Sequence, residues 1–190
     1  MTSALASLTL VLADDHAIVR MGFRLLLEGV GARVLAEADS GEKAQLLMTE
    51  LDPDVLVMDL SMPGCGGLAA LERILARKPG QKVLIASAHA DAIIAERALK
   101  AGAAGYLCKR SPPDELLKAV GLVAAGQRYI DPEIAAALRR ADRPEHPAEA
   151  LTDKELSVFL QLAQGRSVAE VAETFHLSPN TVGTHLSHIK

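Results

Sequence analysis

The chain has no tryptophan, and aromatic residues make up only 3% of its 190 residues. A hydrophobic core must therefore be aliphatic, and a hydrophobic content of 49% is sufficient to build one. The two cysteines, Cys65 and Cys108, are too few for a disulfide framework or a four-cysteine zinc site. Both are compatible with reduced thiols in a cytosol.

Positive charge and long apolar runs are also scarce. The formal net charge is −4, whereas a protein that offers its whole surface to nucleic acid is usually basic. Any DNA binding must therefore be a local property of one segment. The apolar N-terminus lacks a basic leader, and no uncharged apolar run reaches the roughly 18 residues of a membrane span. We therefore expect a cytoplasmic protein that has no membrane partner.

Short apolar runs alternate with longer helical patterns over the first 125 residues. The expected strands are 8–13, 33–37, 54–58, 82–87 and 105–108. The expected helices are 18–28, 42–51, 68–77, 92–101 and 112–125, the last with Ser111 as its N-cap. Near-continuous apolar strands joined by helices predict an α/β domain with a five-stranded, doubly wound parallel sheet. Ligands of such sheets bind beyond the carboxyl ends of the strands.

The pattern changes after Gly126, and we expect three parts: a domain over 1–127, a short helix with a linker over 128–150, and a small all-helical domain over 151–190. Asp131-Pro132 opens the short helix, and the charged, proline-containing stretch that follows lacks apolar periodicity.

Three helix starts are expected in the last part of the chain. Two capping boxes begin at Thr152 and Ser167, and Ser178-Pro179 gives an N-cap followed by proline. The short turn before Ser178 is typical of a helix-turn-helix. The apolar spacing predicts a core of Leu156, Phe159, Leu160, Val168, Val171, Ala172, Leu177, Val182, Leu186 and Ile189.

Charged and hydroxyl side chains follow the expected strands of the α/β domain. Asp14 and Asp15 follow the first strand, Asp59 the third, Ser87 ends the fourth, and Lys109 follows the fifth. At one sheet edge, three carboxylates would repel one another unless a cation joined them, and oxygen ligands suit Mg²⁺. An aspartate can accept a phosphoryl group, whose charge a metal and a lysine would neutralise.

Each of these residues also has a simpler interpretation. Asp15 alone could cap the first helix, Lys109 could be an exposed loop lysine, and Asp59 could be a turn residue. Taken singly, each simpler interpretation is the better one. Their recurrence at one strand end after another favours a shared site.

Four segments resemble the receiver domain of two-component response regulators, over about residues 8 to 125. They are Ala13-Asp14-Asp15-His16, Met58-Asp59-Leu60-Ser61-Met62-Pro63-Gly64, Ala86-Ser87-Ala88 and Gly105-Tyr106-Leu107-Cys108-Lys109. The resemblance implies a flavodoxin-like fold and phosphorylation of Asp59 by a sensor histidine kinase. The implied Mg²⁺ ligands are Asp14, Asp15, Asp59 and the backbone carbonyl of Ser61.

The resemblance also implies a switch. Ser87 and Lys109 would contact the phosphoryl group, and Tyr106 would rotate inward when Ser87 moves. The helix at 92–101 is the candidate element that responds. His16 borders the acidic pair, and we expect it to face solvent or support the ligands, because Mg²⁺ prefers oxygen.

Residues 151–190 resemble the LuxR-type helix-turn-helix of the NarL/FixJ subfamily. The similarity is carried by Leu151-Thr-Asp-Lys-Glu155, Leu162-Ala-Gln-Gly165, Val171-Ala172, and Leu177-Ser-Pro-Asn-Thr-Val182 with His185 and Ile189. It implies binding to double-stranded DNA by a homodimer, with a recognition helix that begins at Ser178. The outward residues of that helix are Asn180, Thr181, Gly183, Thr184, Ser187 and His188.

This segment departs from the LuxR-type pattern in two ways. Position 183, usually lysine in the family, is Gly183, and the segment has three basic and four acidic residues. The chain also stops at Lys190, so we expect the family's last helix, which forms the dimer contact, to be missing.

Two alternatives to a phosphorylation-switched transcription regulator remain open. One is an aspartyl-phosphate enzyme, although such phosphohydrolases want a second aspartate two residues after the nucleophile, where this chain has Ser61. The other is a receiver that acts only through protein–protein contacts. We expect no enzyme activity beyond phosphoryl acceptance on Asp59.

Overall fold

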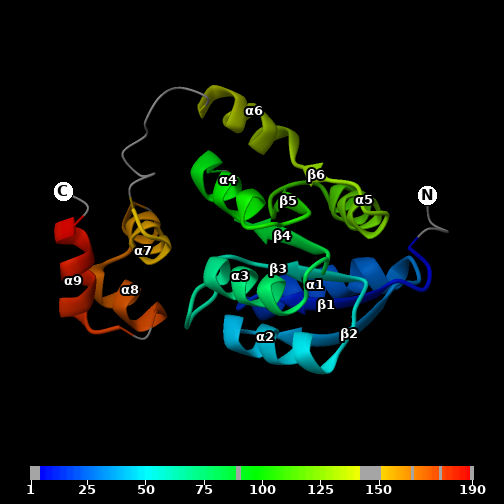
Figure 1. Cartoon of the computed structure of the whole chain (residues 1–190), viewed down its shortest axis with the longest axis horizontal. Coiled ribbons are helices and arrows are strands. Elements are labelled where there is room, and N and C mark those ends of the chain that lie inside the picture. Colours follow the sequence, from blue (N-terminus) through cyan, green and yellow to red (C-terminus); the bar gives the residue numbers. More distant parts are fainter. Residues whose placement is uncertain (1–4, 89–90, 142–150, 164, 176, 189–190) are drawn as a thin grey trace.

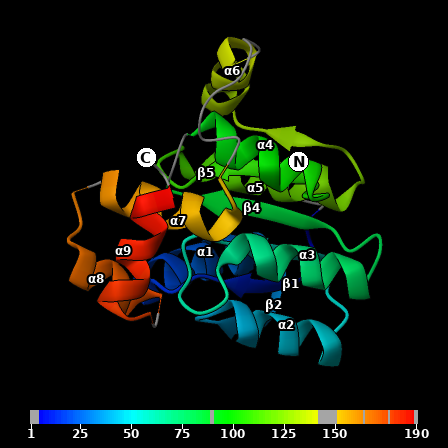
Figure 2. The same ribbon diagram turned by 60° about the vertical axis from the view of Figure 1, so that its left-hand side comes forward.

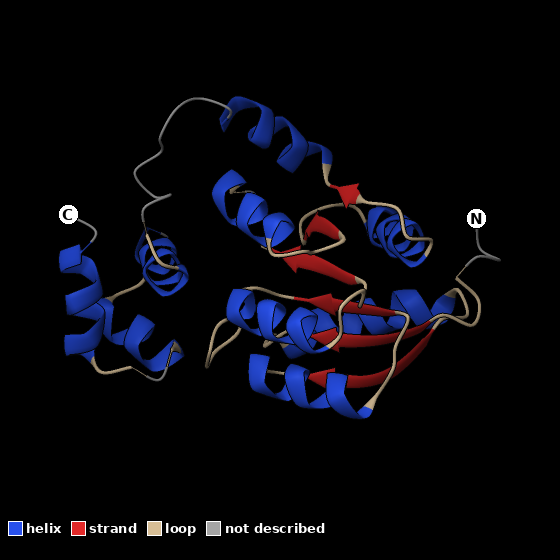
Figure 3. Cartoon of the chain, in the orientation of Figure 1, coloured by secondary structure: helices blue, strands red, loops and turns tan. Residues whose placement is uncertain are grey.

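The computed structural model describes residues 5–88, 91–141, 151–163, 165–175 and 177–188. These residues include a six-stranded parallel sheet in the order β2-β1-β3-β4-β5-β6 (Figure 3). The strands are β1 Thr9–Ala13, β2 Arg33–Ala38, β3 Val55–Met58, β4 Val83–Ser87, β5 Gly105–Cys108 and β6 Tyr129–Ile130. The doubly wound parallel sheet expected from the sequence is confirmed.

The structure adds β6 to the five expected strands. It pairs with β5 through Gly105 opposite Tyr129 and Tyr106 opposite Ile130. A strand of two residues is too short to leave a periodic signal in the sequence. It continues the sheet past β5 and leads directly into the next helix.

Helices cover both faces of the sheet (Figure 1). They are α1 Ala17–Gly29, α2 Gly41–Glu50, α3 Gly67–Arg77, α4 Ala92–Lys100 and α5 Pro113–Ala124. One buried cluster packs α2, α3 and α4 against the sheet, and a second packs α1 and α5 against the opposite face. Because both faces are covered, β3, β4 and β5 are buried along their whole length.

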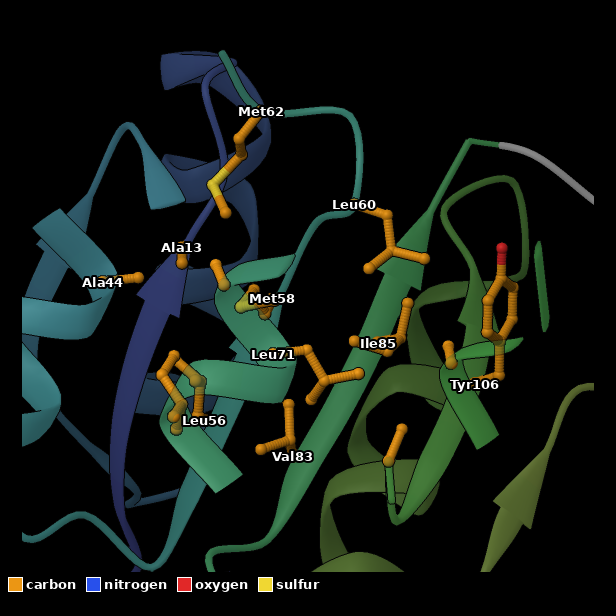
Figure 4. Packing of buried hydrophobic residues seen from close by; sticks show 14 of the residues in the cluster. Ala13, Ala44, Leu56, Met58, Leu60, Met62, Leu71, Val83, Ile85 and Tyr106 are labelled. Atoms are coloured by element: carbon orange, nitrogen blue, oxygen red, sulfur yellow. The ribbon is translucent and has the colours of Figure 1, made fainter. Parts of the chain in front are cut away.

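The first cluster is mainly aliphatic, as the composition requires. Leu56 and Met58 of β3 and Val83 and Ile85 of β4 are almost inaccessible to solvent and meet Leu71 of α3 (Figure 4). Tyr106 is an aromatic member of the same cluster (Figure 4).

The expected N-cap of α5 is wrong. Pro112 occupies the N-cap position and Pro113 begins the helix, so no described side chain caps it. The Ser111 hydroxyl instead donates to the Asp131 carboxylate, 2.5 Å away. This partner is 20 residues further along the chain, so the local pattern around Ser111 could not reveal it.

Helix α6, Pro132–Ala141, extends the short helix expected after Asp131. Asp131 caps it, because its Oδ1 accepts from the Glu133 amide at 3.0 Å. Ile134 of α6 is fully buried and Leu138 packs against the same cluster as α4. Helix α6 includes the start of the charged stretch expected as a linker, and the remainder, residues 142–150, lies outside the described residues.

The described part of residues 151–190 forms three helices, α7 Asp153–Ala163, α8 Val168–Thr174 and α9 Pro179–His188 (Figure 2). Both capping boxes are confirmed. The hydroxyl oxygens of Thr152 and Ser167 accept from the amides of Glu155 and Glu170, and the carboxylates of these glutamates accept from the amides of Thr152 and Ser167. Within the described residues, no helix has the length and hydropathy needed to cross a membrane.

The core expected for these helices is partly wrong. The buried cluster is Val158, Val171, Ala172, Phe175 and Val182, with Leu162, Val168 and Leu177 against it. Phe159 is 37% exposed, and Leu156 packs into the first cluster of the α/β domain. The side chains of Leu160 and Leu186, and all of Ile189, lie outside the described residues.

Helix α7 therefore has two partners. Leu156 and Leu151 contact the α/β domain, and the Leu151 carbonyl accepts a hydrogen bond from Arg97 of α4 at 2.5 Å. Val158, two residues after Leu156, faces the helical core, because two residues span about 200° of a helix.

Candidate active site

The ends of β1 and β3 bring two buried carboxylates together. Ala13 lies opposite Met58 in the paired strands, and Asp14 and Asp59 follow them. The Asp59 amide donates to the Ala13 carbonyl at 2.8 Å. Asp14 is 4% exposed and Asp59 is 2% exposed. The parallel register therefore places both carboxylates at the carboxyl edge, as the sequence predicted.

Lys109, at the end of β5, joins this pair. Its Nζ lies 2.6 Å from Asp14 Oδ2 and 2.7 Å from Asp59 Oδ2, and the lysine side chain is only 10% exposed. One ammonium therefore bridges two carboxylates. This contact argues against the simpler interpretation of Lys109 as an exposed loop lysine.

The pocket carries more negative than positive charge. Burial raises the pKa of Asp59, and the nearby charge of Asp14 raises it further against the opposing effect of Lys109. Burial by itself would lower the pKa of Lys109, but Asp59 and Asp14 outweigh it, so the ammonium stays charged. The arrangement favours a second cation near the carboxylates.

The residues present suit a divalent metal ion. Asp14, Asp15, His16 and Asp59 each offer one ligand atom, and these atoms lie within 4.8 Å of one another. Asp15 Oδ1 is buried and accepts no hydrogen bond from the described residues, although His16 Nδ1 lies 2.7 Å away. Carboxylate oxygens gathered in this way are the ligands that small hard cations prefer.

The neighbouring side chains arrange the acidic loop. The His16 amide donates to Asp14 Oδ1 at 2.9 Å, and the His16 side chain is 58% exposed. The residue at the N-cap of α1 is His16, so Asp15 does not occupy the capping position of the simpler interpretation. Near Asp59, the Ser61 amide donates to Oδ1 at 3.2 Å, which places this loop beside the carboxylate.

Ser87 and Tyr106 lie on the next two strands. Ser87 is fully buried, its carbonyl accepts from the Lys109 amide at 2.8 Å, and its side chain is hydrogen-bonded to Tyr106. The Tyr106 ring is also fully buried, and burial raises the pKa of its hydroxyl. The ring is thus already turned inward and bonded to Ser87, and the rotation of Tyr106 on movement of Ser87 stays a prediction.

Arg20 is a further residue of the site that the sequence pattern does not reveal. This side chain donates to the Asp14 carbonyl at 2.5 Å and to Glu37 Oε2 at 3.2 Å, and it is 15% exposed. Arg20 therefore stabilises the loop that contains Asp14 and Asp15 by linking it to Glu37 of β2. Its position one helical turn after His16 could have suggested this contact, but nothing in the local pattern distinguished it from a surface arginine.

The expected recognition helix, α9, presents polar residues. Asn180, Gly183 and Thr184 are exposed, and Thr181 is half-buried with its amide donating to Ser178 Oγ at 3.0 Å. The side chains of Ser187 and His188 lie outside the described residues. Val182, which lies between Asn180 and Gly183 in the sequence, is buried in the helical core, so the exposed residues share the outward face.

Comparisons with known proteins agree for both halves of the chain. Residues 10–121 match the family described as "Response regulator receiver domain", and residues 149–190 match "Bacterial regulatory proteins, luxR family". The chain is 36% identical over 183 residues to the response regulator UvrY of Escherichia coli K12. That alignment covers 94% of this chain and 84% of the relative.

Two solved structures are similar as well. A LuxR-family two-component response regulator from Aurantimonas sp. SI85-9A1 is 39% identical with a TM-score of 0.69, covering 72% of this chain and 98% of that one. A complex of the response regulator RcsB with DNA is 26% identical with a TM-score of 0.65, covering 96% of this chain and 90% of that one.

Proposed function

This chain is a response regulator of the NarL/FixJ subfamily, with a receiver domain and a LuxR-type DNA-binding domain, and from that premise we propose that phosphorylation of Asp59 by a sensor histidine kinase controls its binding to DNA. In this proposal the receiver extends over 1–127, and the DNA-binding domain over 151–190.

The observation that carries the proposal is the bridge made by Lys109. Two buried carboxylates share one ammonium, so the negative charge of Asp59 is partly neutralised before the reaction begins. When a phosphoryl group arrives, the ammonium already lies beside the Asp59 carboxylate, and a shift of the lysine towards the added oxygens stabilises their charge. Asp59 is the proposed acceptor, because Lys109 holds its Oδ2 and the Ser61 amide holds its Oδ1.

The reaction is a phosphoryl transfer between two side chains. A carboxylate oxygen of Asp59 forms a bond to phosphorus as the bond from phosphorus to the kinase imidazole nitrogen breaks. That nitrogen keeps the bonding electron pair, and the imidazole, already protonated on its other nitrogen, leaves as the neutral ring. Lys109 and the Ser87 hydroxyl stabilise the oxygens of the transferred group. Asp14, Asp15, Asp59 and the Ser61 carbonyl would hold Mg²⁺, which when bound neutralises charge on the phosphoryl oxygens.

The output of the proposed switch is DNA binding. The neighbour RcsB is known in complex with DNA, and in this chain α9 carries the exposed residues Asn180, Gly183 and Thr184. A helix-turn-helix places such a helix in the major groove, and paired half-sites call for a homodimer. We propose that α9 makes these contacts when the phosphorylated protein dimerises.

The proposal is tested with two aspartates of the same segment. Asp59→Asn removes the acceptor. Asp54→Asn is the control, because Asp54 precedes β3 and its carboxylate accepts hydrogen bonds from Thr9 at the opposite edge of the sheet. With acetyl phosphate and Mg²⁺, the wild type and Asp54→Asn should become labelled on Asp59 and, in a chain extended beyond Lys190 by the last helix of the LuxR-type pattern, bind promoter DNA more tightly. Asp59→Asn should show neither effect. An Asp59→Asn protein that is still labelled, or an unchanged mobility shift on labelling of the wild type, would refute the proposal.

A further inference from the structure

Asp131 is a buried carboxylate outside the proposed phosphoacceptor site. It is 3% exposed and accepts three hydrogen bonds. Oδ2 accepts from the Ser111 hydroxyl at 2.5 Å and from the Cys108 amide at 3.4 Å, and Oδ1 accepts from the Glu133 amide at 3.0 Å. One side chain therefore joins the loop after β5 to the first turn of α6.

The loop side of this junction contains Lys109. Cys108 and Ser111 flank the lysine, and both donate to Asp131. The Lys109 amide is fixed to the Ser87 carbonyl at 2.8 Å, and the Ser111 amide to the Cys108 carbonyl at 3.0 Å. Lys109 is thus held in a short segment whose two ends share one anchor.

The other side of the junction is α6. The Asp131 amide donates to the Tyr106 carbonyl at 2.9 Å, and the Asp131 carbonyl accepts from the Ala135 amide at 2.8 Å. Helix α6 packs through the fully buried Ile134 into the cluster that contains Tyr106 and the inner face of α4. Arg97 of α4 in turn donates a hydrogen bond to the Leu151 carbonyl, at the start of the DNA-binding domain.

We propose that Asp131 is a positioning residue that couples Lys109 to α6 through the Ser111 hydroxyl. The inference rests on the proposed function, because Lys109 must shift its ammonium from Asp59 Oδ2 towards the oxygens of a phosphoryl group. The segment from Cys108 to Ser111 follows that shift, and Asp131 carries it into the N-terminal turn of α6. Coupling between two sites is reciprocal, so the docking of α6 also sets the position of Lys109.

Two substitutions separate this coupling from the capping of α6. Ser111→Ala removes the hydroxyl and leaves Asp131 in place. Asp131→Ser keeps a good N-cap residue for α6 but is too short to hold Ser111 and Cys108. Tyr129→Phe is the matched control, because it removes a 2.6 Å hydrogen bond between β6 and Glu115 of α5 that does not involve the Lys109 segment. Ser111→Thr should retain the coupling, because threonine keeps a hydroxyl at this position.

The readout is hydrogen exchange of the α6 backbone amides in the full chain, with and without beryllofluoride and Mg²⁺, whose binding is measured in parallel by calorimetry. In the wild type, beryllofluoride should change the hydrogen-exchange rates of amides in the first turn of α6 by at least about fivefold, the lower end of typical coupling between sites. In Ser111→Ala and Asp131→Ser this response should fall below about twofold, although beryllofluoride still binds. Tyr129→Phe and Ser111→Thr should respond as the wild type does.

The outcomes distinguish this inference from the function on which it rests. A wild-type chain that does not bind beryllofluoride would count against Asp59 as the phosphoacceptor. A wild-type chain that binds it without a response in α6, or a Ser111→Ala chain that responds like the wild type, would overturn the role of Asp131 alone.

Discussion

Asp59 occupies a site that is unfavourable for a charged carboxylate. It is buried next to Asp14 and shares the ammonium of Lys109 with it, while Asp15 lies in the same group of ligand atoms. Burial is the main reason that the pKa of Asp59 is raised. The residue that defines the proposed activity therefore works against the stability of the metal-free fold.

We predict that Asp59→Asn stabilises the metal-free protein at neutral pH. Because the folded-state pKa of Asp59 is above the unfolded value, its contribution to stability is present at low pH and is lost as pH rises through the folded pKa. Asparagine does not titrate and leaves Lys109 paired with Asp14, so the variant should be more stable than the wild type near pH 7, by about 1.4 kcal/mol for each pH unit by which folding raises the pKa of Asp59. The difference should shrink as the pH falls towards about 4, the ordinary range of a carboxyl pKa.

Urea denaturation in EDTA over this pH range measures the effect. Adding Mg²⁺ should reverse the order, because an ion that binds only the folded state stabilises the protein that binds it better. A less stable Asp59→Asn chain in EDTA at neutral pH would show that the charge is fully compensated by Lys109.

The residues of the site differ in how far the sequence could predict them. Asp14, Asp59 and Lys109 were predictable because parallel strands bring their ends to one edge, and the contacts of Lys109 follow from that topology. The Ser111–Asp131 bond was not, because it depends on β6, whose two residues give no periodic signal. The contact of Arg20 with the Asp14 carbonyl likewise involves a backbone atom, which any residue type provides.

At the scale of elements, the starts of α7 and α8 were easier to predict than the faces that these helices bury. The capping boxes at Thr152 and Ser167 are local, so their residue types alone fix where α7 and α8 begin. The buried face of α7 depends on its partners. Apolar spacing predicts Leu156 in the helical core, because spacing alone cannot show that a helix contacts two domains at once.

The start of α3 is packed directly against the Asp59 loop. The Gly67 amide donates to the Leu60 carbonyl at 3.1 Å. A Cβ at position 67 would lie 2.4 Å from Leu60 Cα and 2.6 Å from the Asp59 carbonyl oxygen. These neighbours are backbone atoms, which cannot move aside as a flexible side chain can. The absence of a side chain at Gly67 therefore lets α3 approach the proposed phosphoacceptor.

We predict that Gly67→Ala destabilises the protein by about 1–3 kcal/mol, because the overpacked helix must move away from the loop. It should also weaken beryllofluoride binding, since Asp59 shares the displaced backbone. Gly22→Ala in α1 is the control. A Cβ there meets nothing within 4 Å, so this substitution should stabilise the helix by about 0.5–1 kcal/mol.

Chemical denaturation and calorimetric titration of both variants check the comparison. Equal stability changes at positions 67 and 22 would mean that helix propensity, rather than the close approach of α3, governs both sites.

At the scale of the whole molecule, the two domains meet through α4. Helix α6 packs on this helix, Arg97 donates a hydrogen bond to the Leu151 carbonyl at the start of the DNA-binding domain, and Leu156 belongs to the same buried cluster. The element next to the Ser87–Tyr106 pair is therefore also the one that contacts the DNA-binding half. This arrangement gives a change at the acidic pocket a short path through packed side chains to the output domain.

The charge of the molecule sets a separate limit on DNA binding. The net charge is −4 for the chain, and residues 151–190 contain three basic and four acidic residues. Phosphate contacts supply much of the affinity of a protein for DNA, so a weakly charged domain binds weakly. Gly183 is exposed on the outward face of α9, with nothing within 4 Å of an added Cβ.

We predict that Gly183→Lys raises the affinity of the chain for mixed-sequence duplex DNA and steepens its dependence on salt by about one unit in the log–log slope, the value for one added phosphate contact. Gly183→Ala separates charge from helix propensity, because it stabilises α9 equally well without adding a cation. Fluorescence anisotropy over a salt series measures both quantities. If α9 lies against DNA, the slope changes for lysine and not for alanine, and the effect of lysine fades as salt screens the new contact. Equal slopes for all three proteins would place position 183 away from the phosphate backbone and require another face of the helical domain to bind DNA.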